Sequence, residues 1–102
     1  MRLLLQVPSS SAPLRIYFSG SRLFLVLNAE WTGSQWQLTN AGVDAAGIQL
    51  SQNDVTFLHQ GSAASTWTIW EHGVTLTLAE TYVELVCTGA AGIQQRAYTG
   101  AE

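Results

Sequence analysis

The sequence contains no lysine and few charged residues of any kind. Four arginines and seven acidic residues give a net charge of -3 at pH 7, and charged residues make up 11% of the chain, against roughly 25% in an average soluble protein. Arg2, Arg15, Arg22 and Arg96 are too few and too scattered to form the basic groove that binds a phosphate backbone. We therefore expect no nucleic-acid partner.

Long hydrophobic runs are also missing. The apolar start of the chain, Leu3 to Leu5, is interrupted by Gln6 and Pro8. It is much shorter than the ~20 residues of a membrane helix, and shorter than the apolar region of a signal peptide. We expect this segment to form a first strand and the protein not to insert into a membrane.

Cys87 is the only cysteine, which excludes an internal disulfide. Its neighbours Val83, Leu85 and Val86 are apolar. We therefore expect its thiol to be buried as a small hydrophobic group rather than to be reactive.

Neither a metal site nor a cofactor is indicated. There is no second cysteine and no cluster of histidines for a structural metal. Asp44, Asn53 and Asp54 are rich in oxygen ligands but lack the spacing of a calcium loop.

Catalytic patterns are absent as well. His59 and His72 are the only general-base candidates near neutral pH, and no Gly-x-Ser-x-Gly motif accompanies them. Glu80 and Glu84 would lie ~13 Å apart on a strand, farther than the carboxylate pair of a glycosidase. We expect the protein not to be an enzyme.

What the chain does contain is a repeated alternation of apolar and polar residues, with 47% hydrophobic residues in total. This alternation has the period of β-strands, and only residues 39–47 have a composition that suits even one helical turn. The sequence predicts one all-β domain over residues 1–102, an antiparallel β-sandwich or jelly-roll-like domain of about eight strands. The expected strands are residues 1–7, 14–18, 22–27, 47–50, 54–58, 65–70, 74–78, 82–87 and 93–98.

Several local features are expected from the turn residues and the alternation. Gly20 is the natural turn residue after the second strand, and residues 71–73 are expected to reverse the chain. Residues 74–78 alternate most clearly and are expected to pair with residues 82–87. Residues 22–27 are apolar on both faces, which is typical of a strand buried between two layers.

Four tryptophans occur in two pairs. If residues 32–35 form a hairpin loop around Gly33, Trp31 and Trp36 lie opposite each other as a cross-strand pair. In an extended segment 65–70, Trp67 would point to one face and Trp70 to the other. One of these two indoles is then expected in the core, and the other faces solvent, a partner or a ligand.

Two interpretations of the tryptophans remain open. In the first, all four are packing residues. In the second, Trp36 and Trp70, with Asn40 and Asp44, are candidate ligand contacts, because aromatic faces beside amide and carboxylate groups suit neutral carbohydrates.

One stretch of the chain resembles a known family. Asn28-Ala29-Glu30-Trp31-Thr32-Gly33-Ser34-Gln35-Trp36, followed by Ala46-Gly47-Ile48-Gln49-Leu50 and Ser65-Thr66-Trp67-Thr68-Ile69-Trp70, resembles a segment of bacteriophage tail-fibre and related virion surface proteins. The resemblance covers less than half of the chain. It implies an all-β structural or receptor-binding module, usually trimeric, at the virion surface, and it carries no catalytic residues.

The apolar content also predicts self-association. Residues 3–5 and 23–27 carry more apolar surface than one small two-layer core buries, so we expect another chain to cover the surplus. The resulting expectation is a virion structural or host-attachment protein (a tail-fibre, tail or head-decoration subunit) that forms a symmetric homo-oligomer, with a trimer favoured, and that contacts other virion proteins. The alternative is a secreted lectin-type module that binds a glycan through exposed tryptophans.

Overall fold

The computed structural model describes residues 1–78 and 83–88, and all regular structure in this part of the chain is β-strand. The all-β prediction is therefore confirmed. Accordingly, none of the described residues forms a helix that is long and apolar enough to cross a membrane.

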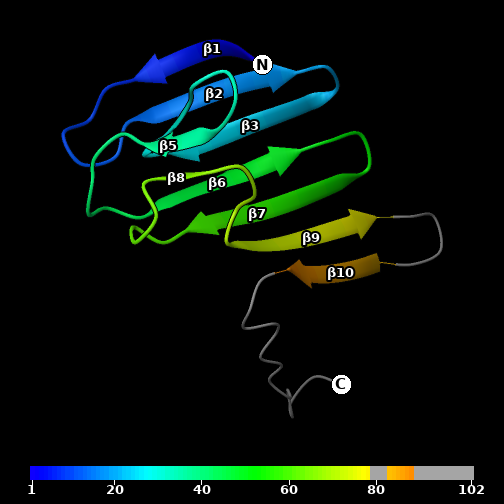
Figure 1. Ribbon diagram of the computed structural model, residues 1–102. Helices are drawn as coiled ribbons and strands as arrows, with labels where there is room; N and C mark the ends of the chain where they lie inside the picture. The colour runs from blue at the N-terminus through cyan, green and yellow to red at the C-terminus, as the bar shows by residue number, and fades with distance from the viewer. Residues whose placement is uncertain (79–82, 89–102) are drawn as a thin grey trace, which may run out of the picture.

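The described residues form ten strands in two antiparallel sheets (Figure 1). The larger sheet has seven strands in the order β1-β2-β3-β6-β7-β9-β10, and the smaller has three in the order β4-β5-β8. The strands are β1 (Arg2–Val7), β2 (Leu14–Ser19), β3 (Arg22–Leu27), β4 (Ala29–Trp31), β5 (Trp36–Leu38), β6 (Ala45–Leu50), β7 (Asp54–Gln60), β8 (Thr66–Trp67), β9 (His72–Leu78) and β10 (Val83–Thr88).

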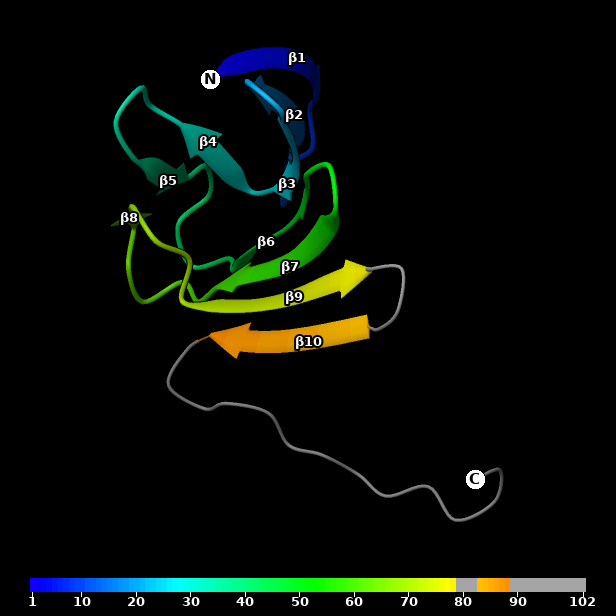
Figure 2. The same cartoon turned by 90° about the vertical axis from the view of Figure 1, so that its right-hand side faces the viewer.

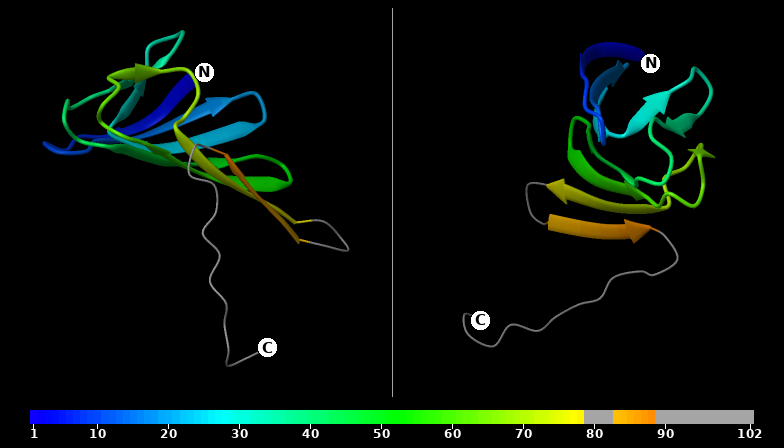
Figure 3. Two further views of the ribbon diagram at one scale, coloured as in Figure 1. Left: turned by 60° about the horizontal axis from the view of Figure 1, so that its bottom comes forward. Right: turned by 90° about the vertical axis from the view of Figure 1, so that its left-hand side faces the viewer.

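The large sheet follows the chain order, with two excursions that build the small sheet. The first excursion, between β3 and β6, supplies β4 and β5, and the second, between β7 and β9, supplies β8. The large sheet curves around the small one, which lies against one of its faces (Figures 2 and 3). We call this covered face the inner face and the opposite one the outer face.

The hydrophobic core lies between the two sheets. Apolar residues of β2 and β3 that point to the inner face pack against the small sheet. The buried members are Tyr17, Phe24, Val26, Ala29, Trp36, Leu38, Ala45 and Trp67.

Gly47 lets β6 pass close to this core. A Cβ at position 47 would lie 2.8 Å from Cγ1 of Val26 and 3.0 Å from the carbonyl oxygen of Leu25. The absence of a side chain at Gly47 is therefore needed for the close packing of β3 against β6.

β1 is the outermost strand beside β2 and is exposed along its whole length. Its pairing with β2 shifts register between Leu3 and Leu5, which is the signature of a β-bulge at Leu4.

Several local predictions are confirmed. Gly20 has a φ of 61° in the turn between β2 and β3, a conformation that glycine adopts without strain. β9 pairs with β10, from the pair Leu78–Val83 to the pair Gly73–Thr88, as the alternation of residues 74–78 predicts. Within the described residues no helix forms at residues 39–47.

Other expectations are wrong. β3 is buried on one face only, because the small sheet covers only the inner face, so Leu25 and Leu27 are exposed. His72 and Gly73 do not reverse the chain but begin β9. Cys87 is half-buried rather than buried. The strand expected at residues 93–98 lies outside the described residues, and so does Glu80.

Candidate functional site

Trp36 is the centre of an aromatic cluster between the two sheets. It pairs with Trp31 across the β4–β5 hairpin, as predicted, and the two ring centroids are 5.3 Å apart in an edge-to-face arrangement. Tyr17 and Phe24, from the large sheet, lie 5.6 and 5.7 Å from the same indole. Trp36 itself is only 3% exposed. Trp36, one of the candidate ligand contacts, is thus a core residue. Its neighbours Trp31 and Trp70, rather than Trp36 itself, are partly exposed to solvent.

Trp67 and Trp70 lie on the same side of the chain, against the prediction that they point to opposite faces. β8 ends at Trp67 and the next residues bend, so that Trp70 packs 5.1 Å from Trp67 and 5.6 Å from Trp36. Ile69, between the two tryptophans, is 84% exposed. The strand expected over residues 65–70 is only Thr66–Trp67 in the structure. Side chains after Trp67 therefore do not follow the alternation of an extended strand.

Two indole N–H groups of this cluster lack acceptors. Nε1 of Trp67 and Nε1 of Trp70 are covered by surrounding atoms and donate no hydrogen bond within the described structure. A buried unpaired N–H is unfavourable and calls for a structural reason.

A hollow opens beside the cluster, at the end of the sandwich near the β2–β3 turn. It encloses ≈ 380 Å³ and is lined by Phe24, Trp31, Trp36 and Trp70 together with polar side chains from both layers. These polar residues are Ser19, Arg22, Gln49 and Thr68, and Met1 completes the lining. Trp31 and Trp70 are half-buried, so each keeps part of its ring available at the wall of the hollow.

Asn40 and Asp44, the other two candidate ligand contacts, do not lie in this hollow. Asn40 belongs to a network around Asn28, which is fully buried at the corner between β3 and β4 with a φ of 59°. The Asn28 amide nitrogen donates to the carbonyl oxygens of Asn40 and Val43, at 3.1 and 2.7 Å, and the Asn40 N–H donates to Asn28 Oδ1 at 2.8 Å. Both residues therefore hold the connection between the two sheets together.

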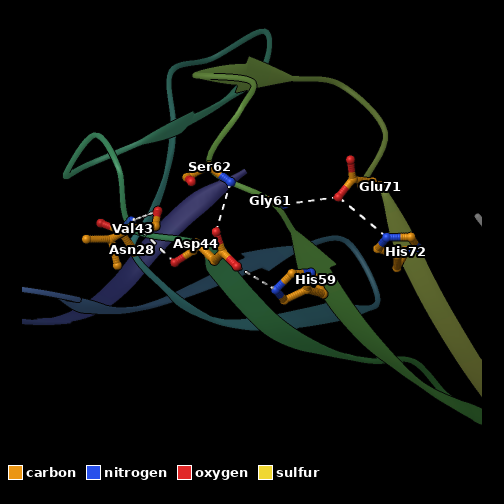
Figure 4. A network of polar contacts seen from close by, with 8 residues as sticks. All are labelled: Asn28, Val43, Asp44, His59, Gly61, Ser62, Glu71 and His72. Atoms are coloured by element: carbon orange, nitrogen blue, oxygen red, sulfur yellow. Dashed lines mark hydrogen bonds and ion pairs between the residues drawn. The ribbon is translucent and has the colours of Figure 1, made fainter.

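Asp44 joins a neighbouring set of polar contacts (Figure 4). Its Oδ1 accepts a hydrogen bond from the backbone N–H of Ser62, and its Oδ2 lies 3.3 Å from Nε2 of His59. On the adjacent strand, Nε2 of His72 lies 3.5 Å from Oε1 of Glu71. The two imidazole rings stack with centroids 6.1 Å apart.

The structure does not gather these groups into a metal site. Among the described residues, no three or more His, Cys, Asp or Glu side chains are placed to hold one ion. Asp44 and Asp54 lie at opposite ends of the β6–β7 hairpin, and the Asp54 carboxylate accepts a hydrogen bond from the Ser51 hydroxyl.

The outer face of the large sheet carries an unbroken apolar surface. Directly paired residues of antiparallel strands lie on the same face, so the strand registers define rows across it. The middle row takes one residue from each of the seven strands: Leu5, Ile16, Leu25, Ile48, Phe57, Val74 and Cys87.

Two further rows flank the middle one. Phe18, Leu23, Leu50, Val55, Leu76 and Leu85 form the row toward the β2–β3 turn, with Arg2 at its end. Val7, Leu14, Leu27, Ala46, His59 and His72 form the row on the other side. The two histidines thus lie at the margin of this surface, and nothing in the described chain covers it.

Sequence reasoning missed the polar lining of the hollow and the extent of the outer face. Arg22, Gln49 and Thr68 come from three separate elements, and no local pattern joins them. The apolar outer face could have been predicted from the sequence, because Leu23, Leu25 and Leu27 alternate with the inner-face residues Phe24 and Val26. The sequence matches no protein-family model, no curated protein and no solved structure, so the site stands on its geometry alone.

Proposed function

We propose that this protein is a non-enzymatic structural subunit that associates with copies of itself through the outer face of its seven-stranded sheet. The observation that carries the proposal is the middle row of that face, which crosses all seven strands without a single charged residue. Leu5, Leu25 and Phe57 in this row are exposed in the isolated chain. A contiguous apolar surface of this kind is typical of an interface.

A second copy of the chain is the occupant that fits this surface best. An apolar face without charges needs no complementary charge pattern on its partner, so two identical faces are compatible with each other. Symmetric association also closes after a fixed number of copies. A permanent interface of this type buries upwards of ~2,000 Å² in total and is mostly apolar.

The setting that we propose is the surface of a virion. The resemblance of the Trp31–Trp36 hairpin and of its neighbours to tail-fibre modules supports this setting, and it also supports three copies around one axis. The proposal predicts that the gene lies among genes for other particle proteins. A position among genes for unrelated secreted enzymes would contradict the virion setting without affecting self-association.

Sedimentation of the purified protein at micromolar concentration tests the association. Because apolar contacts are not screened by salt, the complex is expected to persist in ~1 M salt. A single species at 11.0 kDa would overturn the proposal. A dimer would overturn only the number of subunits.

A pair of variants assigns the interface. The Phe57→Asp substitution places a charge in the middle row, where burial against another chain would be costly, and it is expected to yield the 11.0 kDa subunit. Ile69→Asp is the matched control, because Ile69 is an exposed apolar residue outside the large sheet. This control is expected to retain the mass of the parent complex.

A further inference from the structure

The hollow between the two sheets has the composition of a small-ligand site, independent of the outer face. Its volume of ≈ 380 Å³ is at the lower end of the range of about 300–1,000 Å³ for ligand pockets, which suits one sugar ring. Partly exposed indoles, Trp31 and Trp70, stand at its wall. Such faces stack on the apolar side of a pyranose ring.

The polar groups of the hollow favour an acidic sugar over a neutral one. Arg22 is the only charged side chain among the described residues that line it, and no carboxylate is present there to accept hydrogen bonds from the hydroxyl groups of a neutral sugar. Arg22 is exposed, and its guanidinium has no hydrogen-bond or ion-pair partner among the described residues, although its backbone pairs with Ser19. A free guanidinium binds a carboxylate with two parallel hydrogen bonds.

Further hydrogen-bond partners surround this position. Gln49 and Thr68 come from opposite layers, and their side chains offer donors and acceptors for ring hydroxyls. Nε1 of Trp70 has no acceptor in the described structure. A small turn of this ring toward the hollow would present its N–H to a sugar oxygen.

We propose that the hollow binds a carboxylate-bearing monosaccharide unit of the uronic acid class. The sugar ring stacks on Trp70 or Trp31, the carboxylate pairs with Arg22, and the hydroxyl groups reach Gln49 and Thr68. Binding of this kind does not require self-association.

Titration with glucuronate, glucose and acetate tests the proposal. Tryptophan fluorescence reports on binding, because three of the lining residues are indoles, and saturation-transfer NMR identifies the sugar protons that contact them. Glucuronate is expected to bind at least about tenfold more tightly than glucose or acetate, since the charged hydrogen bonds and the ring stacking act together. Equal binding of glucuronate and glucose, or equal binding of glucuronate and acetate, would overturn the proposal.

Two variants assign the contacts. Arg22→Gln is expected to abolish the preference for glucuronate over glucose, whereas Arg2→Gln, the same change on the outer face, is expected to leave the preference intact. Trp70→Phe keeps an aromatic ring in the cluster and is expected to weaken glucuronate binding several-fold. Retention of full binding by Arg22→Gln would contradict the assignment.

Salt separates this proposal from the proposed function. Binding through Arg22 is expected to weaken as the salt concentration rises, whereas association through the outer face is expected to persist. If glucuronate does not bind but the complex persists in high salt, the ligand proposal has failed. If glucuronate binds but no complex is found, the self-association proposal has failed.

Discussion

The two faces of the large sheet differ in character where β6, β7 and β9 lie side by side. On the inner face, these strands present the half-buried polar residues Gln49, Thr56 and Thr75, which are paired across the strands. The hydroxyl groups of Thr56 and Thr75 lie 2.9 Å apart in a hydrogen bond. Directly behind them on the outer face, the same strands present Ile48, Phe57 and Val74 in one row.

The difference indicates which surface meets water. A polar row on one face of an antiparallel sheet is typical of a face that contacts water. An apolar row on the opposite face is unfavourable unless another surface covers it. The residues of β6, β7 and β9 therefore distinguish a polar face from an apolar face within one sheet, and the apolar face is the one that we propose for self-association.

The largest expected effect of a single change is at the contact between the small sheet and the inner face. Trp36→Ala removes the indole that contacts Tyr17, Phe24, Trp31 and Trp70. We expect the free energy of unfolding to fall by about 3–5 kcal/mol, measured by urea denaturation. Ile69→Ala, at an exposed position, is the control and should change it by less than about 0.5 kcal/mol. A loss below about 1 kcal/mol for Trp36→Ala would show that the cluster is not the core.

The next effect concerns the buried corner that joins the two layers. Asn28→Asp keeps the shape of the side chain but replaces the amide donor by an oxygen, which faces the carbonyl oxygens of Asn40 and Val43. Since a buried acceptor without a donor costs about 1–3 kcal/mol, we expect a decrease of about 2 kcal/mol in the free energy of unfolding at pH 7. Thermal or urea denaturation measures it, and an unchanged midpoint would mean that the corner is hydrated.

A smaller effect is expected where the sheet packs most closely behind the core. Gly47→Ala introduces a methyl group 2.8 Å from Cγ1 of Val26, and overpacking of this kind costs about 1–3 kcal/mol. In a Val26→Ala background the same change should cost less, because the nearest clashing atom is gone. A double-mutant cycle measures this coupling, and equal costs in both backgrounds would contradict the contact.

The smallest effect on the fold is expected on the outer face. Phe57→Ser truncates a side chain that is 49% exposed in the single chain. We expect the free energy of unfolding of the dissociated subunit to change by less than about 1 kcal/mol, while sedimentation shows a weaker complex. A large loss of subunit stability together with an unchanged complex would reverse the assignment of the two faces.

The sequence allowed most of the strands and the tryptophan hairpin to be predicted, because both depend on local signals. Alternation identifies residues 74–78, and Gly33 between Trp31 and Trp36 identifies a hairpin whose register the structure confirms. These features need only neighbouring residues, so a single sequence contains them.

The candidate site was harder to predict from the sequence, because its geometry depends on packing between segments that are far apart in the chain. Trp70 turns toward Trp36 only because β8 stops at Trp67, and the pairing of β8 with β5 joins segments that are far apart in the chain. Asn40 was a candidate ligand contact because it is close to the tryptophans in the sequence. In the structure its backbone N–H donates instead to Asn28 in the corner before β4. Polar residues near an aromatic pair in sequence are thus no guide to the polar residues near it in space.

The bulge in β1 has a consequence for contacts between the edges of two sheets. A free sheet edge offers unpaired backbone groups that could recruit the edge of a neighbouring molecule, and repeated recruitment of this kind leads to open-ended, amyloid-like polymers. The register shift between Leu3 and Leu5 occurs in the pairing of β1 with β2 and places an extra residue in the middle of the outermost strand. A bulge of this kind also increases the local twist and turns the edge away from a straight partner strand. Side-by-side joining of two sheets through β1 is thereby hindered, although this strand is exposed along its whole length.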